Sequence, residues 1–324
     1  MAGPDKLDKI KKFLKTSGWI KVPFSISFLA AGEYNANYLV KSDTGNTVLR
    51  INHGSQLGLG EKQIEYEYKV LKALSGSGVT PGPIACHNHP EPLGGGALLM
   101  DYLPGKPLVY QRDLEKAAHI FARVHTAPLV KGLVVQADPV MDIARESKGL
   151  LNRFPDHPLV KERNLLQAYY ETVLLLAEET RTMFADEARC LVNTEVNSGN
   201  FLISDSGAYL VDWEKAVESC RYQDLGHFIV PTTTLWKSDT ILGQDEKKYF
   251  LRAYHQEACP EMDLSVMIQK TRVLEKAILL RALSWCFMAW YEYTRTDRQL
   301  QNMDTLSKIN QYLSDIPWIL HSVI

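Results

Sequence analysis

The chain has 324 residues, of which 45% are hydrophobic and 23% charged, an ordinary globular composition with enough length for two lobes. Its formal net charge of −2 gives no basic excess for binding nucleic acid or an anionic membrane. The longest apolar stretch, residues 277–291, is interrupted by Arg281 and Ser284 and is shorter than the ~20 residues that cross a bilayer. The five cysteines are widely scattered, which argues against a disulfide framework and predicts a reducing, cytoplasmic location.

The N-terminal third of the chain is predicted to be rich in strands. Its first residues are amphipathic, with Leu7, Ile10 and Leu14 on one helical face, and they lack the apolar core of a signal peptide. Residues 24–52 then alternate apolar and polar side chains in short runs around an Asp-Thr-Gly-Asn turn at 43–46. This pattern is typical of antiparallel strands joined by hairpins.

A helix is expected over residues 61–74, because apolar side chains recur on one face. The Ser-Gly-Ser-Gly sequence at 75–78 ends it, since glycine readily takes the left-handed turn that closes a helix. Two further strands are expected at 83–86 and 97–103.

The character of the chain changes after Pro104-Gly105. Residues 112–127, 159–185 and most of 245–315 read as helices, and only 200–212 is expected to return to strands, as one hairpin. Strands segregated from helices predict an α+β fold with a small antiparallel lobe, residues 1–104, and a larger helical lobe, residues 105–324.

The segment 191–216 carries the strongest chemical signal. Glu195 and Asn200 lie five residues apart in a loop, and a hairpin then returns the chain to Asp212. Phosphoryl transfer from a nucleoside triphosphate needs a carboxylate beside the acceptor hydroxyl, hard oxygen ligands for Mg²⁺, and a cation that clamps the phosphates. The spacing is expected to bring a carboxylate for the acceptor hydroxyl and oxygen ligands for Mg²⁺ close together.

This segment resembles the aminoglycoside phosphotransferase and choline kinase-like family, whose fold is protein-kinase-like. The family's loop typically reads His-Gly-Asp-Leu-His-Pro-Gly-Asn, and a hairpin after it ends Ile-Asp-Trp-Glu. This chain reads Asn-Thr-Glu-Val-Asn-Ser-Gly-Asn at 193–200 and Val-Asp-Trp-Glu at 211–214. Asn193 and Asn197 thus replace two histidines, and Glu195 replaces the aspartate.

The resemblance extends over residues 25–235. It implies a kinase that transfers the γ-phosphate of ATP, or of GTP, to a hydroxyl of a small-molecule acceptor. Asn200 and Asp212 would bind Mg²⁺, and Glu195 would take the place of the catalytic base. Asp224 matches a family Asp-Leu pair that is mainly structural, and His125 is likewise expected to be structural.

The small lobe would then supply the phosphate-binding parts. Residues 31–37, which include Gly32, lie between two strands as a phosphate-covering loop would, and Arg50 lies on the strand where the family has Lys or Arg. The resemblance implies Glu67 as the partner of Arg50, because Glu67 precedes Leu71 and Leu74 at i+4 and i+7, the family's usual register. Glu65 is the competitor, although it would point off the helical face that these three residues share.

Residues 98–105 are interpreted as the connector between the lobes. The resemblance implies that backbone groups of Met100, Asp101 and Tyr102 bind adenine, with Met100 lining the pocket. A core strand followed by a turn is the structural alternative, and both interpretations are compatible.

Glu195 leaves two interpretations open. A glutamate keeps the negative charge of aspartate on an arm longer by one methylene, so a working kinase with an adapted loop is favoured by the presence of Asn200 and Asp212. The alternative is a catalytically impaired pseudokinase that binds nucleotide. A protein kinase is disfavoured, because the chain between Asp212 and Asp224 is too short for an activation segment.

The acceptor is expected to be aminoglycoside-like or an amino alcohol, bound in the helical lobe. Aromatic faces can hold a quaternary ammonium, although a Trp and Tyr stripe on a long helix is more often core. The candidates are acidic or aromatic residues after the hairpin: Glu214, Glu218, Trp236, Asp239, Trp285, Trp290, Tyr291 and Tyr293.

Overall fold

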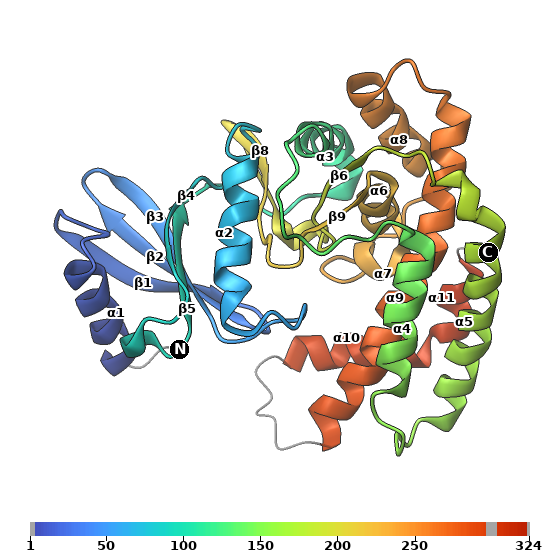
Figure 1. Ribbon diagram of the computed structural model, residues 1–324, viewed down its shortest axis with the longest axis horizontal. Coiled ribbons are helices and arrows are strands. Elements are labelled where there is room, and N and C mark those ends of the chain that lie inside the picture. The colour runs from blue at the N-terminus through green and yellow to red at the C-terminus, as the bar shows by residue number, and fades with distance from the viewer. Residues whose placement is uncertain (1–3, 296–302, 323–324) are drawn as a thin grey trace. The chain divides into compact units, whose positions relative to one another are not determined.

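The computed structural model describes residues 4–295 and 303–322, and the chain divides into two compact units (Figure 1). Unit 1 contains Met1–Lys106 with two later segments, Ala127–Leu133 and Leu202–Ala216. Unit 2 contains Pro107–Thr126, Val134–Phe201 and Val217–Ile324. The predicted α+β class is confirmed, because strands dominate the first unit and helices the second.

Unit 1 is built on an antiparallel sheet of five strands in the order β1-β2-β3-β5-β4. The strands are β1 (Phe24–Ala31), β2 (Asn35–Ser42), β3 (Gly45–Asn52), β4 (Pro83–His87) and β5 (Gly96–Asp101). The predicted turn at 43–46 joins β2 to β3, and Gly45 takes a positive φ of 130° there, which a side chain would disfavour.

Two helices cover opposite faces of this sheet, α1 (Pro4–Thr16) and α2 (Gln63–Leu74) (Figure 1). Leu49 and Ile51 of β3 belong to the apolar cluster that α1 completes. Because successive strand side chains point to opposite faces, Arg50 between them is turned toward α2. The sheet therefore places one buried cation on the side of α2.

Unit 2 is mainly helical, with the long helix α9 at its centre (Figure 1). The helices that pack against α9 are α4, α5, α6, α7, α8 and α10. The helices of unit 2 are α3 (Tyr110–His125), α4 (Pro139–Asn152), α5 (Val160–Thr180), α6 (Tyr222–Ile229), α7 (Pro231–Thr234), α8 (Gln244–Ala258), α9 (Leu264–Arg295), α10 (Met303–Ser314) and α11 (Ile316–His321). Among the described residues, no helix has both the length and the apolar character that a bilayer span requires.

The expected hairpin at 200–212 is present as β7 (Phe201–Ser204) and β8 (Gly207–Leu210). The expectation that only this segment returns to strands is wrong. β6 (Arg189–Val192) and β9 (Val217–Cys220) form a second antiparallel pair, just before the loop and just after the Asp-Trp-Glu segment. Each has only four residues, too few to show a period, and they pair across an intervening hairpin.

Candidate active site

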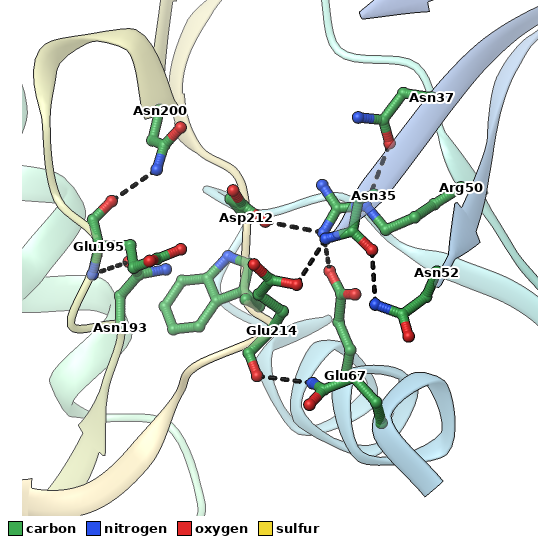
Figure 2. Close-up of polar contacts among 12 residues, drawn as sticks. Asn35, Asn37, Arg50, Asn52, Glu67, Asn193, Glu195, Asn200, Asp212 and Glu214 are labelled. Carbon is green, nitrogen blue, oxygen red and sulfur yellow. Dashed lines mark hydrogen bonds and ion pairs between the residues drawn. The ribbon is translucent and has the colours of Figure 1, made fainter. Parts of the chain in front are cut away.

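Arg50 is the centre of a charged cluster in unit 1 (Figure 2). Its side chain is 5% exposed, and Nη1 donates to Glu67 Oε1 at 2.5 Å and to Asp212 Oδ1 at 2.8 Å. Nε donates to Asn37 Oδ1 at 3.1 Å. The structure thus joins the expected Arg50–Glu67 pair to Asp212, which the sequence analysis selected from a different motif.

The charge of Arg50 is maintained by these acidic neighbours. Burial by itself would lower the pKa of the guanidinium, but the carboxylates of Glu67, Asp212 and Glu214 raise the pKa above its ordinary value. Guanidinium remains protonated throughout the accessible pH range, and a buried one must be paired. Arg50 is therefore a fixed positive charge.

Only one of the two candidate partners on α2 reaches Arg50. Glu67 is buried and pairs with it, whereas Glu65 pairs with Lys69 at 2.7 Å and accepts from Asn88 at 3.0 Å. The side chain of Glu65 is 38% exposed. The helical register therefore separates a buried, Arg-bound glutamate from a solvated one two residues earlier.

Asp212 lies in a strained turn after β8. Its φ is +67°, a left-handed conformation that is uncommon for a residue with a Cβ. The next residue, Trp213, is fully buried, and its indole Nε1 donates to the carbonyl of Leu210 at 3.0 Å. The buried indole thus anchors the residue after Asp212, whose own side chain is 27% exposed.

The loop at 193–200 belongs to unit 2 and is fixed by its own asparagines. Asn193 Oδ1 accepts the N–H of Glu195 at 2.9 Å, and Asn197 Oδ1 accepts the N–H of Gly199 at 3.0 Å. Asn200 Nδ2 donates to the carbonyl of Glu195 at 2.6 Å (Figure 2). The two asparagines that replace histidines thus each close a turn on the residue two positions later.

Asp224 on α6 supports this loop and is fully buried. Its carboxylate accepts the N–H of Asn193 at 2.8 Å and the N–H of Thr194 at 3.0 Å. Thr194 has a left-handed φ of +63°. His125 Nε2 lies 3.4 Å from Asp224 Oδ2, and its Nδ1 lies 2.8 Å from the hydroxyl of Tyr254. Asp224 and His125 are thus buried parts of the support that orients the loop.

The donor atoms available in each unit suit Mg²⁺, which prefers carboxylate and amide oxygens. Asp212 offers a carboxylate that is only partly covered by its bond to Arg50. Asn200 uses its nitrogen on the Glu195 carbonyl, which turns its side-chain oxygen the other way (Figure 2). Both side chains therefore carry oxygen atoms of the kind that Mg²⁺ prefers.

The residues expected to bind the nucleotide lie along the turns of unit 1. The N–H of Gly32 donates to the carbonyl of Asn35 at 2.9 Å, which closes the turn between β1 and β2. Met100 is buried at the end of β5. The N–H of Asp101 donates to Gly82 at 2.9 Å, and the N–H of Tyr102 points to Asn46 at 3.4 Å. Both of these amides are therefore already engaged within unit 1.

Most of the aromatic acceptor candidates in unit 2 are packing residues. Tyr291 stacks on Phe154 with 4.3 Å between ring centroids, and its hydroxyl donates to Asp156 at 2.6 Å. Trp290 Nε1 donates to Asn310 at 3.0 Å. Of the acidic candidates, Glu218 pairs with Arg189 at 2.8 Å across the β6–β9 pair. Tyr293 is buried whereas Trp290 and Tyr291 are half-buried, so the stripe is partly core and partly packed surface.

Trp236 differs, because it lines a cavity of about 410 Å³ in unit 2. The other lining residues are Lys237, Asp304, Thr305, Ser307, Lys308 and Gln311. The cavity is close to the loop, since a Cβ added at Gly199 would meet Lys237 Cγ at 3.5 Å. It presents an aromatic ring together with charges of both signs.

Sequence reasoning missed the polar residues that surround Glu214, which it selected as an acceptor candidate. Asn35 Nδ2 donates to Glu214 Oε2 at 2.6 Å, and Gln63 Nε2 donates to the Glu214 carbonyl at 2.7 Å. The first contact spans 179 residues of sequence. No local pattern indicates such a pair, although a buried Asn at the start of a strand is itself unusual.

A strand-rich unit with a buried Arg–Glu pair, and a helical unit with a loop of Glu and Asn residues, define a protein-kinase-like phosphotransferase fold. The chain belongs to the phosphotransferase enzyme family, whose sequence profile matches residues 25–264. None of the curated proteins compared with the chain is significantly similar to it in sequence.

Solved structures share the fold at low sequence identity. An ethanolamine kinase from Plasmodium vivax superposes with a TM-score of 0.65 at 12% identity, covering 96% of this chain and 89% of its own. The choline kinase LicA from Streptococcus pneumoniae gives 0.62 at 15% identity, with 95% and 98% covered. A streptomycin–ATP complex of the aminoglycoside phosphotransferase APH(2'')-IIa gives 0.59 at 14% identity, with 97% of each chain covered.

Proposed function

We propose that the protein is a small-molecule kinase that transfers the γ-phosphate of ATP, or of GTP, to a hydroxyl of an aminoglycoside-like or amino-alcohol acceptor. The observation that carries the proposal is the cluster in which Arg50 binds both Glu67 and Asp212, within the segment that matches the phosphotransferase family. A buried cation bound to a helix glutamate is the arrangement that kinases use to hold phosphates.

Arg50 is proposed to clamp the phosphates, and Glu67 to orient it. A guanidinium presents several N–H donors in one plane, so it can contact phosphate oxygens while keeping its bond to Glu67. The Arg50 contact to Asp212 would then be shared with, or exchanged for, a phosphate oxygen. Gly32 is proposed to let the turn between β1 and β2 approach the phosphates.

Glu195 is proposed to accept the proton of the acceptor hydroxyl, or to orient that hydroxyl for attack on the γ-phosphate. Its backbone is fixed at both ends, by Asn193 on its N–H and by Asn200 on its carbonyl. A fixed backbone limits the positions that the carboxylate of the longer side chain can take. This matters because transfer depends mainly on the placement of the attacking oxygen. Asn200 and Asp212 are proposed to hold Mg²⁺, which would neutralise charge on the phosphates when bound.

Backbone groups at residues 100–102 are proposed to recognise the adenine ring, with Met100 in the pocket wall. Since the amide of Asp101 already donates to Gly82, its carbonyl is the group proposed to contact the base. The acceptor is proposed to enter the cavity beside Trp236. Asp304 and the Trp236 ring are the lining groups that suit the ammonium group of such an acceptor, whereas Lys237 and Lys308 give the cavity a net positive charge.

Nucleotide consumption in the presence of Mg²⁺ tests the proposal, with pooled aminoglycosides, amino alcohols and sugars as acceptors. Wild type would show acceptor-dependent turnover, and Asp212→Ala would abolish it. Glu195→Gln would lower kcat by ~10²–10⁴-fold, the usual share of a general base. Glu178→Gln, an exposed change on α5, is the matched control.

Glu195→Asp separates a working site from an impaired one. In an adapted loop, shortening the arm misplaces the carboxylate by about 1 Å and would lower kcat by ~10²-fold. A gain of activity would instead indicate an impaired base. Mg²⁺-dependent ATP binding without turnover in wild type, Glu195→Asp and every acceptor pool would overturn the kinase and leave a nucleotide-binding pseudokinase.

A further inference from the structure

We propose that Asn35 and Glu214 form a latch that fixes the turn between β1 and β2 to the Asp212 segment, and that both are positioning residues. The latch rests on the proposed function for its kinetic consequences, but its geometry lies wholly within unit 1. It would hold the phosphate-covering turn and the proposed metal ligand as one body.

The latch is a buried amide–carboxylate pair. Asn35 Nδ2 donates to Glu214 Oε2 at 2.6 Å, and each residue is 6% exposed (Figure 2). A buried carboxylate must be paired to offset its loss of water, and a bond to a charged acceptor is among the stronger hydrogen bonds. The contact therefore requires a donor at position 35 and an acceptor at position 214.

Both partners are fixed by further bonds, so neither side chain can rotate freely. Asn52 lies opposite Asn35 in the β2–β3 register, and its Nδ2 donates to Asn35 Oδ1 at 2.8 Å. Gln63 of α2 donates to the Glu214 carbonyl at 2.7 Å, and its Oε1 accepts the hydroxyl of Ser55 at 2.5 Å. The chain of contacts thus runs from the sheet through Glu214 to α2.

The latch stands close in sequence to two proposed functional groups. Gly32 donates its N–H to the carbonyl of Asn35 at 2.9 Å, so the turn closes on the latch residue itself. Glu214 follows Asp212 by two residues, with the buried Trp213 between them. Movement of the turn would therefore pull on the segment that carries Asp212. The position of the Asn35–Glu214 bond beside both the turn and Asp212 is therefore the reason to propose a positioning role for it.

An exchange of the two functional groups tests the latch. Asn35→Asp sets two carboxylates against each other, while Asn52 can still donate to one oxygen of the side chain at position 35. Asn35→Asp combined with Glu214→Gln reverses the polarity, since the new amide donates to the new carboxylate and Asn52 still donates to its second oxygen. Glu214→Gln alone keeps a neutral version of the original bond.

The expected result is a loss in the single variant and its recovery in the double variant. In Asn35→Asp, KM for MgATP would rise by ~10-fold or more, with a smaller fall in kcat, because the turn binds nucleotide while Glu195 lies on another segment. The double variant would return to within ~3-fold of wild type, and Glu214→Gln would be intermediate. Asn46→Asp, an exposed change on the same sheet, is the matched control.

Hydrogen exchange of the amides in residues 31–36 gives a readout that needs no turnover. The latch predicts faster exchange in Asn35→Asp and restored protection in the double variant. If Asn35→Asp fails to fold, the exchange rates of Glu214→Gln and the double variant are compared instead. The latch then predicts slower exchange in the double variant. Unrestored exchange in the double variant, or unchanged exchange in Asn35→Asp, overturns the latch. Restored protection in the double variant, together with no turnover by wild type in any acceptor pool, would leave the latch standing and overturn the kinase.

Discussion

Replacement of Asp224 by asparagine is the sharpest test of how the proposed catalytic loop is held. The fully buried carboxylate accepts the N–H of Asn193 on both oxygens, at 3.1 and 2.8 Å, and the N–H of Thr194 on Oδ1 at 3.0 Å. An amide has one oxygen and one NH₂ group. The Asp224→Asn substitution would therefore set an NH₂ group against the N–H of Asn193 at the closest of these contacts.

The cost follows from the three contacts. With the amide oxygen at the Oδ1 position, two bonds persist but lose their charge, at a cost of about 1 kcal/mol each, and the contact at 2.8 Å is lost at a further ~2 kcal/mol. Asp224→Asn should therefore lower the free energy of unfolding by ~3–4 kcal/mol. Release of the left-handed Thr194 would also displace Glu195 and lower kcat by ~10²-fold.

Urea unfolding at pH 7 gives the change in stability, and steady-state kinetics of the same preparation give the change in kcat. Asp205→Asn, in the exposed turn between β7 and β8, is the matched control and should change stability by less than about 0.5 kcal/mol. A loss below ~1 kcal/mol in Asp224→Asn would refute the reasoning, because it would mean that the loop does not depend on the charge of Asp224.

Three other perturbations follow from buried charges. Arg50→Met should destabilise the protein by ~3–5 kcal/mol in urea unfolding by leaving Glu67 buried without its cation, and adding Glu67→Gln should recover part of that loss rather than add to it. Lys247→Met removes the cation that pairs with Glu275, a carboxyl whose pKa burial raises. The loss in free energy of unfolding should therefore be smaller at pH 5 than at pH 7, because protonation neutralises Glu275 at the lower pH. Equal losses at the two pH values would contradict this. Burial would raise the pKa of Asp113, but bonds from neighbouring cations and a backbone amide outweigh it and hold the pKa below its ordinary value. Its stabilisation is therefore present above about pH 4 and lost on acidification, and Asp113→Asn should flatten the acid limb of an unfolding profile.

The strands and first helices could be predicted from sequence because their signals are local. Alternation over residues 24–52 with glycine at the turn gives β1 to β3, and the helix expected at 61–74 is α2, Gln63–Leu74. The expected strand at 97–103 ends two residues earlier, at Asp101, where the backbone turns to bond Gly82 and Asn46. Local periodicity and turn chemistry determine where an element lies more reliably than where it stops.

The sequence analysis missed one helix and one pair of strands in unit 2. Helix α4, Pro139–Asn152, was not predicted, although Asp138 accepts the N–H of Met141 at 3.4 Å as a helix cap and Pro139 starts the first turn. The Asp-Pro pair was the available signal. Strands β6 and β9 pair across the hairpin that separates them, so only the tertiary fold identifies them.

The candidate site likewise contains residues that the sequence indicates and residues that only the fold reveals. Arg50 and Glu67 could be paired from sequence through the family resemblance, and helical register then favoured Glu67 over Glu65. The partners of Glu214 could not, since Asn35 and Gln63 reach it from distant segments and neither lies in a recognisable motif. Spacing along the chain predicts which groups carry chemistry, whereas the residues that orient them emerge only when distant segments pack.

Backbone strain provides an argument for function that does not depend on the motif. Thr194 and Asp212 are the non-glycine residues with positive φ among those described, one immediately before Glu195 and the other a proposed metal ligand. A strained residue costs about 1–3 kcal/mol and persists only where its surroundings impose it. Asp224 imposes it on Thr194 through a buried carboxylate, and the buried Trp213 imposes it beside Asp212. Two strained positions, one beside Glu195 and one at Asp212, therefore support the proposal that this loop and turn have a functional role.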